Sequence, residues 1–368
     1  MAAKVIRISD DAGANWTNLP GSQGTLSSEA EAVDDTIFGQ TYGSTDIGLV
    51  GWSVSSDGIF KGFSGYLAEI KKEGTSTALA GTETFTLVSG KTYQIDDATK
   101  EIWDRSVAIA FLDGVTPIAE ADILNVDYLF GRVTFVASFT PGGAITTDGG
   151  TDPGAFFPTI AIGKANTYSL TMTAEAIDET DFATAQGNSG TRIFKPGLRS
   201  VALELGGIQI VVASTHNPKI DLRNRTEVVI EIDPAGDGSS IARGFFKLAT
   251  VAEAGAVGAL EEETLNYALT VPDPPATGAN AGRAIEFPFN WQHTNTTLNS
   301  AIQFALTSWL TELNTYDVQY LPQGAPGQTP LDGIEGNFIV TDISLSGGLS
   351  NMNVFTIELQ GTGQFTEV

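Results

Sequence analysis

The residues of this sequence that could do chemistry are carboxylates. Asp34-Asp35 and Asp178-Glu179 are the adjacent acids that would be proposed as a general acid and base for glycoside hydrolysis. They stand at matching positions of a repeated segment. Because an enzyme seldom needs the same acid pair twice, whereas a repeated structural corner uses the same residues in both copies, we predict that these acids are not catalytic.

Other catalytic or metal-binding patterns are weak. His216 and His293 lie far apart among polar neighbours, and neither belongs to a spaced histidine motif, so we interpret both as exposed or hydrogen-bonded. Asp127, Asp233 and Asp237 could contribute to a calcium site, but their spacing does not match an EF-hand loop. The sequence contains no nucleophile elbow or phosphate-binding loop. We therefore predict no enzymatic activity, no cofactor and no metal.

The repeat itself is the most informative feature. Segment 30–38 reappears as segment 174–182, and six of the nine positions are identical. After a loop, both copies continue with a glycine-leucine pair and an apolar-rich strand, at Gly48-Leu49 and at Gly197-Leu198. The loop is five residues longer in the second copy, which fits an insertion at a surface turn. Duplicated units usually build architecture such as rings or stacks.

The charge is strongly acidic in both halves. The net charge is −25, of which residues 1–158 contribute −12 and residues 159–368 contribute −13. A chain with this charge should not bind nucleic acid phosphates tightly, but it could line a surface that polyanions pass without adhering. The alternative interpretation is solubility or a saline habitat. Cysteine is absent, which excludes disulfides and thiolate metal sites and fits synthesis in a reducing cytoplasm.

The order of apolar runs and turns predicts a mainly β protein. Short β-branched runs alternate with Gly-rich turns, as in sandwiches and barrels. One helix is predicted over 297–313, where apolar residues recur at steps of three and four. The turn-rich stretch between Phe139 and Thr159 predicts two domains, 1–158 and 159–368, and a length of 368 residues suits two domains of roughly 150 each. Stretches 272–283 and 322–330 are interpreted as surface insertions. No segment reads as a membrane span or a cleavable signal.

The repeated corner resembles a known family. An Ile/Val-Asp-x-Thr corner, a loop, a Gly-Leu pair and a strand are similar to the start of the major tail tube proteins of long-tailed, siphovirus-like bacteriophages. Both copies carry this pattern, from Val33 to Leu49 and from Ile177 to Leu198, and segments 127–135 and 355–365 are similar in kind.

The resemblance implies an architecture and a function. It implies two tandem β-sandwich domains, each with a flanking helix, and six such units contributing to a closed β-barrel in a ring. Three chains would then form a pseudo-hexameric homotrimer, and rings would stack into the tube through which viral DNA is ejected. The loops 34–48 and 178–197 would reach a neighbouring subunit or ring. The expected assembly residues are Asp34, Asp35, Thr36, Phe38, Gly48, Leu49, Asp178, Glu179, Thr180, Phe182, Gly197 and Leu198.

The resemblance also implies partners and a location. The chain would bind further copies of itself, a tape measure protein inside the lumen, and tail terminator or tip proteins at the ends. DNA would pass without specific binding, and the protein would reside in the virion tail after synthesis in the host cytoplasm, without membrane insertion. Alternatives are another virion component, such as a decoration or baseplate protein, a β-sandwich carbohydrate-binding surface protein, or a carbohydrate-active enzyme.

Overall fold

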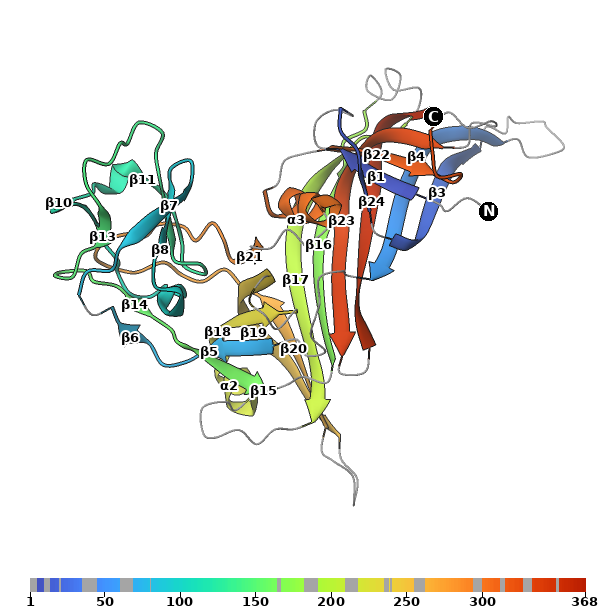
Figure 1. The fold of residues 1–368 in the computed structure, drawn as a ribbon. Coiled ribbons are helices and arrows are strands. Elements are labelled where there is room, and N and C mark those ends of the chain that lie inside the picture. The colour runs from blue at the N-terminus through green and yellow to red at the C-terminus, as the bar shows by residue number, and fades with distance from the viewer. Residues whose placement is uncertain are drawn as a thin grey trace. The chain divides into compact units, whose positions relative to one another are not determined.

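Strands dominate the computed structural model (Figure 1). The prediction of a mainly β protein is therefore confirmed. The residues that the structure describes are 5–9, 14–19, 21–34, 45–59, 69–79, 81–163, 167–181, 191–208, 218–234, 238, 240–254, 262–293, 300–311, 315–326, 333–348 and 351–368. None of the sheets formed by the described strands closes on itself within the chain.

The described residues form two compact units. The first consists of Met1–Tyr66, Tyr168–Ala202 and Asn295–Val368, and the second of Leu67–Thr167 and Leu203–Thr294. These units do not coincide with the predicted segments 1–158 and 159–368, because each unit draws strands from both segments. The turn-rich stretch 140–158 lies inside the second unit.

Long strands of eight or more residues follow one another in pairs along the chain. Such strands suit a sequence in which β-branched and apolar residues alternate with serine, threonine and acids. Their bounds are β3 (Gly21–Asp34), β4 (Thr45–Ile59), β16 (Thr167–Asp178), β17 (Phe194–Ile208), β19 (Ser240–Ala254), β20 (Glu262–Leu269), β23 (Ile334–Gly348) and β24 (Asn351–Glu367). Shorter partners are β1 (Val5–Ser9), β2 (Thr17–Asn18), β5 (Glu69–Glu73), β15 (Thr159–Gly163), β18 (Glu227–Asp233), β21 (Phe289–His293) and β22 (Tyr316–Leu321).

The strand orders of two sets of elements match one another. The first set has the order β2-β1-β22-β23-β24-β4-β3, and the second set has the order β15-β5-β18-β19-β20-β17-β16. Each set also has a helix immediately before the third strand of its order: α3 (Ser300–Thr311) before β22, and α2 (Pro218–Asn224) before β18. The helix predicted over 297–313 is thus confirmed as α3. The sequence repeat falls on the equivalent strands β3 and β16.

The chain order of these sets is nested. The second set runs from β5 to β20, and all of it stands between β4 and α3 of the first set. We infer that one copy of the unit is inserted into a surface loop of the other, where a connection tolerates added length. The resemblance implied consecutive copies instead.

Two β-bulges give the residue correspondence between the sets. The β19–β20 ladder shifts register between Leu248 and Thr250, and one of the three register shifts of the β23–β24 ladder lies between Val340 and Asp342. Because a bulge inserts one residue at a defined point of a ladder, the two bulges align the strands. Val251 therefore corresponds to Ile343, and each lies two residues beyond its bulge.

Residues 74–158 form an insertion between β5 and β15. Its strands are β6 (Thr77–Ala78), β7 (Phe85–Ser89), β8 (Thr92–Ile95), β9 (Phe111–Asp113), β10 (Thr116–Pro117), β11 (Ile123–Asp127), β12 (Arg132–Phe135), β13 (Ile145–Thr147) and β14 (Ala155–Phe156). They surround a core that contains Trp103, Phe111 and Phe130 and also takes in Phe245 of β19 and Ile285. The insertion is therefore packed on the sheet of the second unit.

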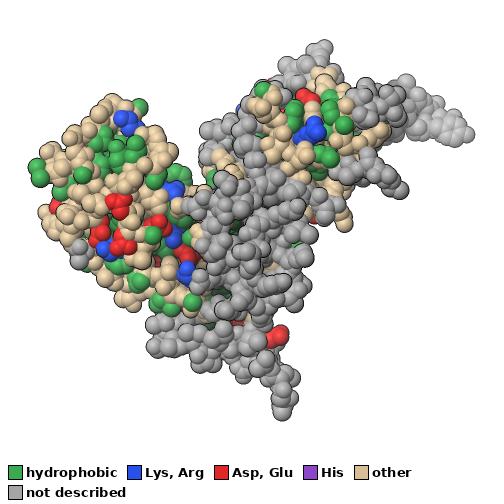
Figure 2. Space-filling model, viewed as in Figure 1, with side chains coloured by type: hydrophobic (Ala, Val, Ile, Leu, Met, Phe, Trp, Pro, Cys, Tyr) green, Lys and Arg blue, Asp and Glu red, His purple; other side chains and the backbone are tan. Residues whose placement is uncertain are grey.

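Two buried arginines attach this insertion to the sheet. Arg105 donates to Glu73 and Glu227 over 2.6 and 2.9 Å. Arg243 pairs with Glu231 of β18 and Glu101 of the insertion over 2.7 and 2.8 Å. Figure 2 shows acidic and basic side chains lying next to one another on the described surface of the second unit.

Segment 270–288, between β20 and β21, packs against the same insertion. The Asn280 side chain donates to the Ile109 carbonyl over 2.6 Å, and Arg283 pairs with Glu120 over 3.0 Å. The predicted surface insertion 272–283 therefore lies within this packed segment. β20 and β21 both pair with β19, so the segment interrupts what is one continuous strand, β24, in the first set.

The buried arginine cluster generates a stability prediction. Arg243→Ala should lower the free energy of unfolding by about 3–5 kcal/mol, because Glu101 and the buried Glu231 would both lose the guanidinium, and Glu231 would keep only Lys71 among its described ion-pair partners. Urea unfolding of the second unit, followed by tryptophan fluorescence, measures this. Lys195→Ala, which removes an exposed ion pair with Glu179, is the control and should cost about 0–1 kcal/mol. Equal losses for both variants would contradict the assignment.

Candidate functional site

The expected assembly residues lie at the ends of two equivalent hairpins. Asp34 ends β3, and Gly48 and Leu49 lie in β4. In the second copy, Asp178 ends β16, Glu179 and Thr180 follow it, and Gly197 and Leu198 lie in β17. The remaining expected residues, Asp35, Thr36, Phe38 and Phe182, lie outside the described residues.

The acidic corner of the second copy is built as a turn. The Asp178 carboxylate accepts the backbone N–H of Thr180 over 2.9 Å, and the Thr180 hydroxyl accepts the N–H of Ile193 over 2.8 Å. Hydrogen bonds from Thr180 and the nearby Arg192 guanidinium hold the pKa of Asp178 below its usual range. Glu179 forms an ion pair with Lys195. These carboxylates therefore organise the corner.

Arg192 brings the two hairpins together. Its backbone N–H donates to the Val50 carbonyl over 3.0 Å, and its own carbonyl accepts the N–H of Gly363 over 2.8 Å. Its guanidinium lies 3.5 Å from Glu31 and 3.7 Å from Asp178, one acid from each copy of the repeat. The base of the second loop thus contacts the first copy within the same chain. Arg192 lies outside the repeated segment, so the repeat gave no signal for its role.

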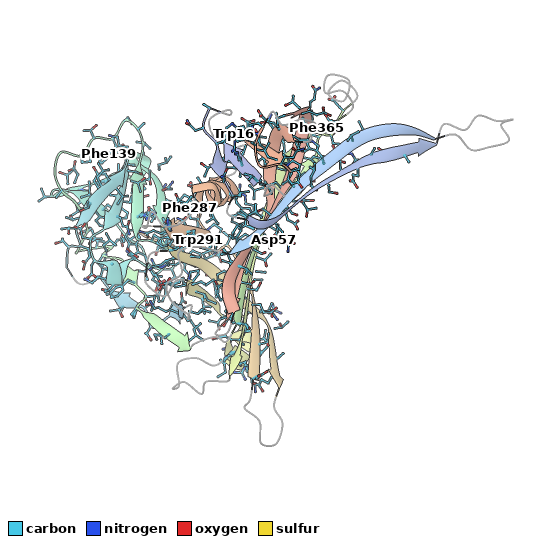
Figure 3. All side chains as sticks on the ribbon, turned by 45° about the vertical axis from the view of Figure 1, so that its right-hand side comes forward. Trp16, Asp57, Phe139, Phe287, Trp291 and Phe365 are labelled. Atoms are coloured by element: carbon cyan, nitrogen blue, oxygen red, sulfur yellow. The ribbon has the colours of Figure 1, made fainter. Side chains whose placement is uncertain are left out.

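One face of the sheet in the first unit is polar. Residues directly opposite one another on neighbouring antiparallel strands share a face. Such opposite residues form the row Thr25–Ser55–Glu358–Asp342 and the row Gln23–Asp57–Thr356–Ser344. Asp57 lies on the hairpin of β3 and β4 (Figure 3). These two rows contain Ser, Thr, Gln, Asp and Glu but neither Lys nor Arg.

The other face of the same sheet is apolar. The alternate residues form the row Leu26–Val54–Leu359–Val340. Trp52 is buried on this face, and its ring centroid lies 4.2 Å from that of Phe338. A Cβ atom at Gly361 would lie only 2.4 Å from the indole ring, so this glycine makes room for Trp52. Because of this alternation, one side of the sheet faces the core and the other is polar.

Asp342 and Glu358 oppose one another directly on the polar face. Partial burial, and then the negative charge of Glu358, raise the pKa of Asp342 to about 6. Like charges at opposite positions of a ladder cost stability. The pair was missed by sequence reasoning, although the alternation of Asp342, Ser344 and Ser346 with apolar neighbours could have placed Asp342 on this face.

The other candidate ligands do not converge. Asp127 is buried and accepts the backbone N–H groups of Leu129 and Phe130, and Asp233 accepts that of Gly238. No group of three or more potential metal ligands occurs among the described residues. Asp237 and His216 lie outside them.

His293 ends β21. Burial lowers its pKa, and neither ring nitrogen has a hydrogen-bond partner in the described part of the chain. The interpretation of His293 as exposed or hydrogen-bonded is therefore wrong, because packing around β21 buries both nitrogens.

No helix of the described ranges is long and apolar enough to cross a membrane.

Comparisons with known proteins found limited likeness. No family model matches the chain, and no curated protein matches it. Among solved structures, the virion of a native gene transfer agent particle is similar at 19% identity and a TM-score of 0.27, covering 30% of this chain and 82% of that chain. The tail of an empty gene transfer agent particle with C6 symmetry is similar at 20% identity and a TM-score of 0.26, covering 31% and 81%.

The opposed acids generate a pH prediction. Since the folded-state pKa of Asp342 lies above its ordinary value of 3.8, stability should fall as pH rises from about 4 to 6 and the carboxyl ionises beside Glu358. Asp342→Asn should therefore raise the melting temperature at pH 7 and leave it unchanged at pH 3.5. Thermal unfolding at both pH values measures this. A gain that is equal at both would show that the charge is not responsible.

Proposed function

We propose that this chain is a structural virion protein, the tail tube subunit of a long-tailed bacteriophage. Three copies would form a pseudo-hexameric ring, and rings would stack into the tube through which DNA is ejected. The observation that carries the proposal is the order of the long strands, β3-β4-β24-β23-β16-β17-β20-β19. This run consists of two sets of four in matching order, so one chain supplies two ring units.

The ends of this run support self-association. β3 pairs only with β4 among the described strands, and β19 has no described partner beyond Lys247 on its β18 side. Exposed strand edges are prone to pair with other chains. The two edges belong to different strands, so a contact between them is heterologous and closes into a ring when the rotation per chain permits. With two units per chain, six units close as three chains.

The polar face supports an inner channel. The cross-strand rows that include Asp57, Asp342 and Glu358 give this face negative charge and many hydroxyl groups. A wet, acidic wall would repel the phosphates of DNA and keep it from adhering. We assign this face to the lumen, where a tape measure protein would also lie before ejection. Tail terminator or tip proteins would cap the two ends of the tube.

Electron microscopy tests the assembly. Negative-stain images of the purified protein at rising concentration should show threefold rings or hollow tubes, because the free edges become satisfied only in a closed ring. Analytical ultracentrifugation of the same samples should show a trimer or larger species. A monomer at every concentration, in both measurements, would refute the proposed function.

A map of the assembled tube tests the lumen assignment. The side chains of Asp57, Asp342 and Glu358 should face the channel, because the opposite face of their strands is the apolar core. A channel lined by neutral or basic residues, with these acids on the outside, would overturn the assignment while leaving the ring intact.

A further inference from the structure

In the first unit, the β16–β17 hairpin covers part of one edge of β23. β23 pairs with β22 only as far as Phe338, and β16 is also its hydrogen-bonded neighbour. β24 pairs along the whole length of the other edge of β23, so β16 must occupy the edge beyond Phe338. The following strand, β17, contributes Arg199, which donates to the Leu310 carbonyl of α3 over 3.1 Å and lies over the Trp309 ring.

This contact buries the covering strand and the covered edge. Met172 and Ala174 of β16 are 0% and 7% exposed, and Ile343 and Leu345 of β23 are each 1% exposed. Both strands of this pairing therefore bury apolar side chains. Burial of this kind is the main favourable contribution to strand docking.

The equivalent edge in the second set is not covered in the same way. β19 pairs with β18 as far as Lys247, and beyond it only β20 is paired with β19 among the described strands. Val251 and Glu253, which correspond to the buried Ile343 and Leu345, are half-buried and exposed. The edge that β16 covers on β23 thus has no strand partner on β19 in the described part of the chain.

A cleft lies at this open edge. It has a volume of about 280 Å³ and lies between α2 and β19. Its lining combines apolar and charged side chains, from Lys219, Leu222, Arg223, Val251 and Glu253. The cleft occupies the place that corresponds to the region between α3 and β23, which the β16–β17 hairpin covers.

The strand equivalent to β16 is β3, and its edge is open as well. Ser28 and Ala30 correspond to Met172 and Ala174 through the sequence repeat, yet both are exposed. β3 carries Glu29, Glu31 and Asp34 and no basic residue. Lys219 at the cleft pairs with Glu253 over 2.6 Å, so the charge of β3 is complementary to Arg223 in particular. The chain thus contains a hairpin, β3–β4, that covers no described edge, and an edge, that of β19 beyond Lys247, that no described hairpin covers.

We propose that the cleft between α2 and β19 is the docking site for the β3–β4 hairpin of a second copy of this chain. The hairpin extends the sheet at β19 as β16 extends it at β23, and it buries Ser28 and Ala30 against Val251. Glu29 then lies near Arg223, and this charge pairing favours the correct partner edge, whereas Glu31 lies beside Arg192 of its own chain. The inference rests on the proposed self-assembly and specifies its interface.

Cysteine cross-linking tests the interface, since the native chain contains no cysteine. The variants are Ala30→Cys with Val251→Cys, and Ser28→Cys with Val251→Cys, which allow for two registers. Under mild oxidation of the assembled protein, at least one pair should give covalent dimers and trimers on a non-reducing gel. In a closed ring the ladder should stop at three chains.

The matched control is Ala30→Cys with Val115→Cys. Val115 is 92% exposed in the insertion and is not part of the proposed interface, so it should give no more cross-linking than the single variants. If rings form but both test pairs stay at the control level, the interface is wrong and the proposed function stands. If no assembly forms at any concentration, both are wrong.

A charge exchange provides an independent variant. Arg223→Glu should raise the concentration needed for assembly about tenfold or more, because it places a carboxylate opposite the acids of β3. Adding Glu29→Arg should restore assembly towards the native concentration. Light scattering against protein concentration measures both, and circular dichroism checks folding. A folded Arg223→Glu protein that assembles normally would overturn the proposed docking site.

Discussion

The alternation of side chains along long paired strands is the constraint on which the first unit depends. Because successive residues of a strand point to opposite faces, Val54, Leu359 and Val340 can form a core only if Ser55, Glu358 and Asp342 form the opposite face. A shift of one residue would exchange the two faces. Trp52 is buried against Gly361, where a larger residue would collide with the indole ring, and this close packing fits the observed register.

Pairing of long strands also leaves backbone N–H and C=O groups at the edges of the sheet that need a partner. Within the first unit, β16 satisfies the edge of β23, and Arg192 and Arg199 hold its hairpin in place through backbone carbonyls. The edges of β3 and β19 have no such partner among the described strands. One strand edge is paired within the chain, and the equivalent edge has no described partner. A chain of this kind is well suited to assembly by repetition, since the contact within the chain and the proposed contact between chains would be alike.

In the second unit, buried ion pairs attach the insertion to the sheet. Its insertion is fixed by Arg105 and Arg243, whose guanidinium groups each contact two carboxylates and an aromatic ring. Removing one member of such a cluster is costly, so these pairs make the attachment specific. A firmly attached insertion adds surface to the subunit without interrupting its long strands.

The sequence by itself determined the local features of this protein. Periodicity was sufficient for the mainly β class and for α3, and the identity between segments 30–38 and 174–182 located two equivalent hairpins, because these signals depend on neighbouring residues. Only the tertiary structure decided that the copies are nested, that β16 covers β23, and that Asp342 opposes Glu358. The β16–β23 pairing joins strands more than a hundred residues apart and leaves no local signal, since it depends on which edges meet when the chain packs. The position of Glu358 opposite Asp342 depends on the register shifts of the β23–β24 ladder, which local alternation does not predict.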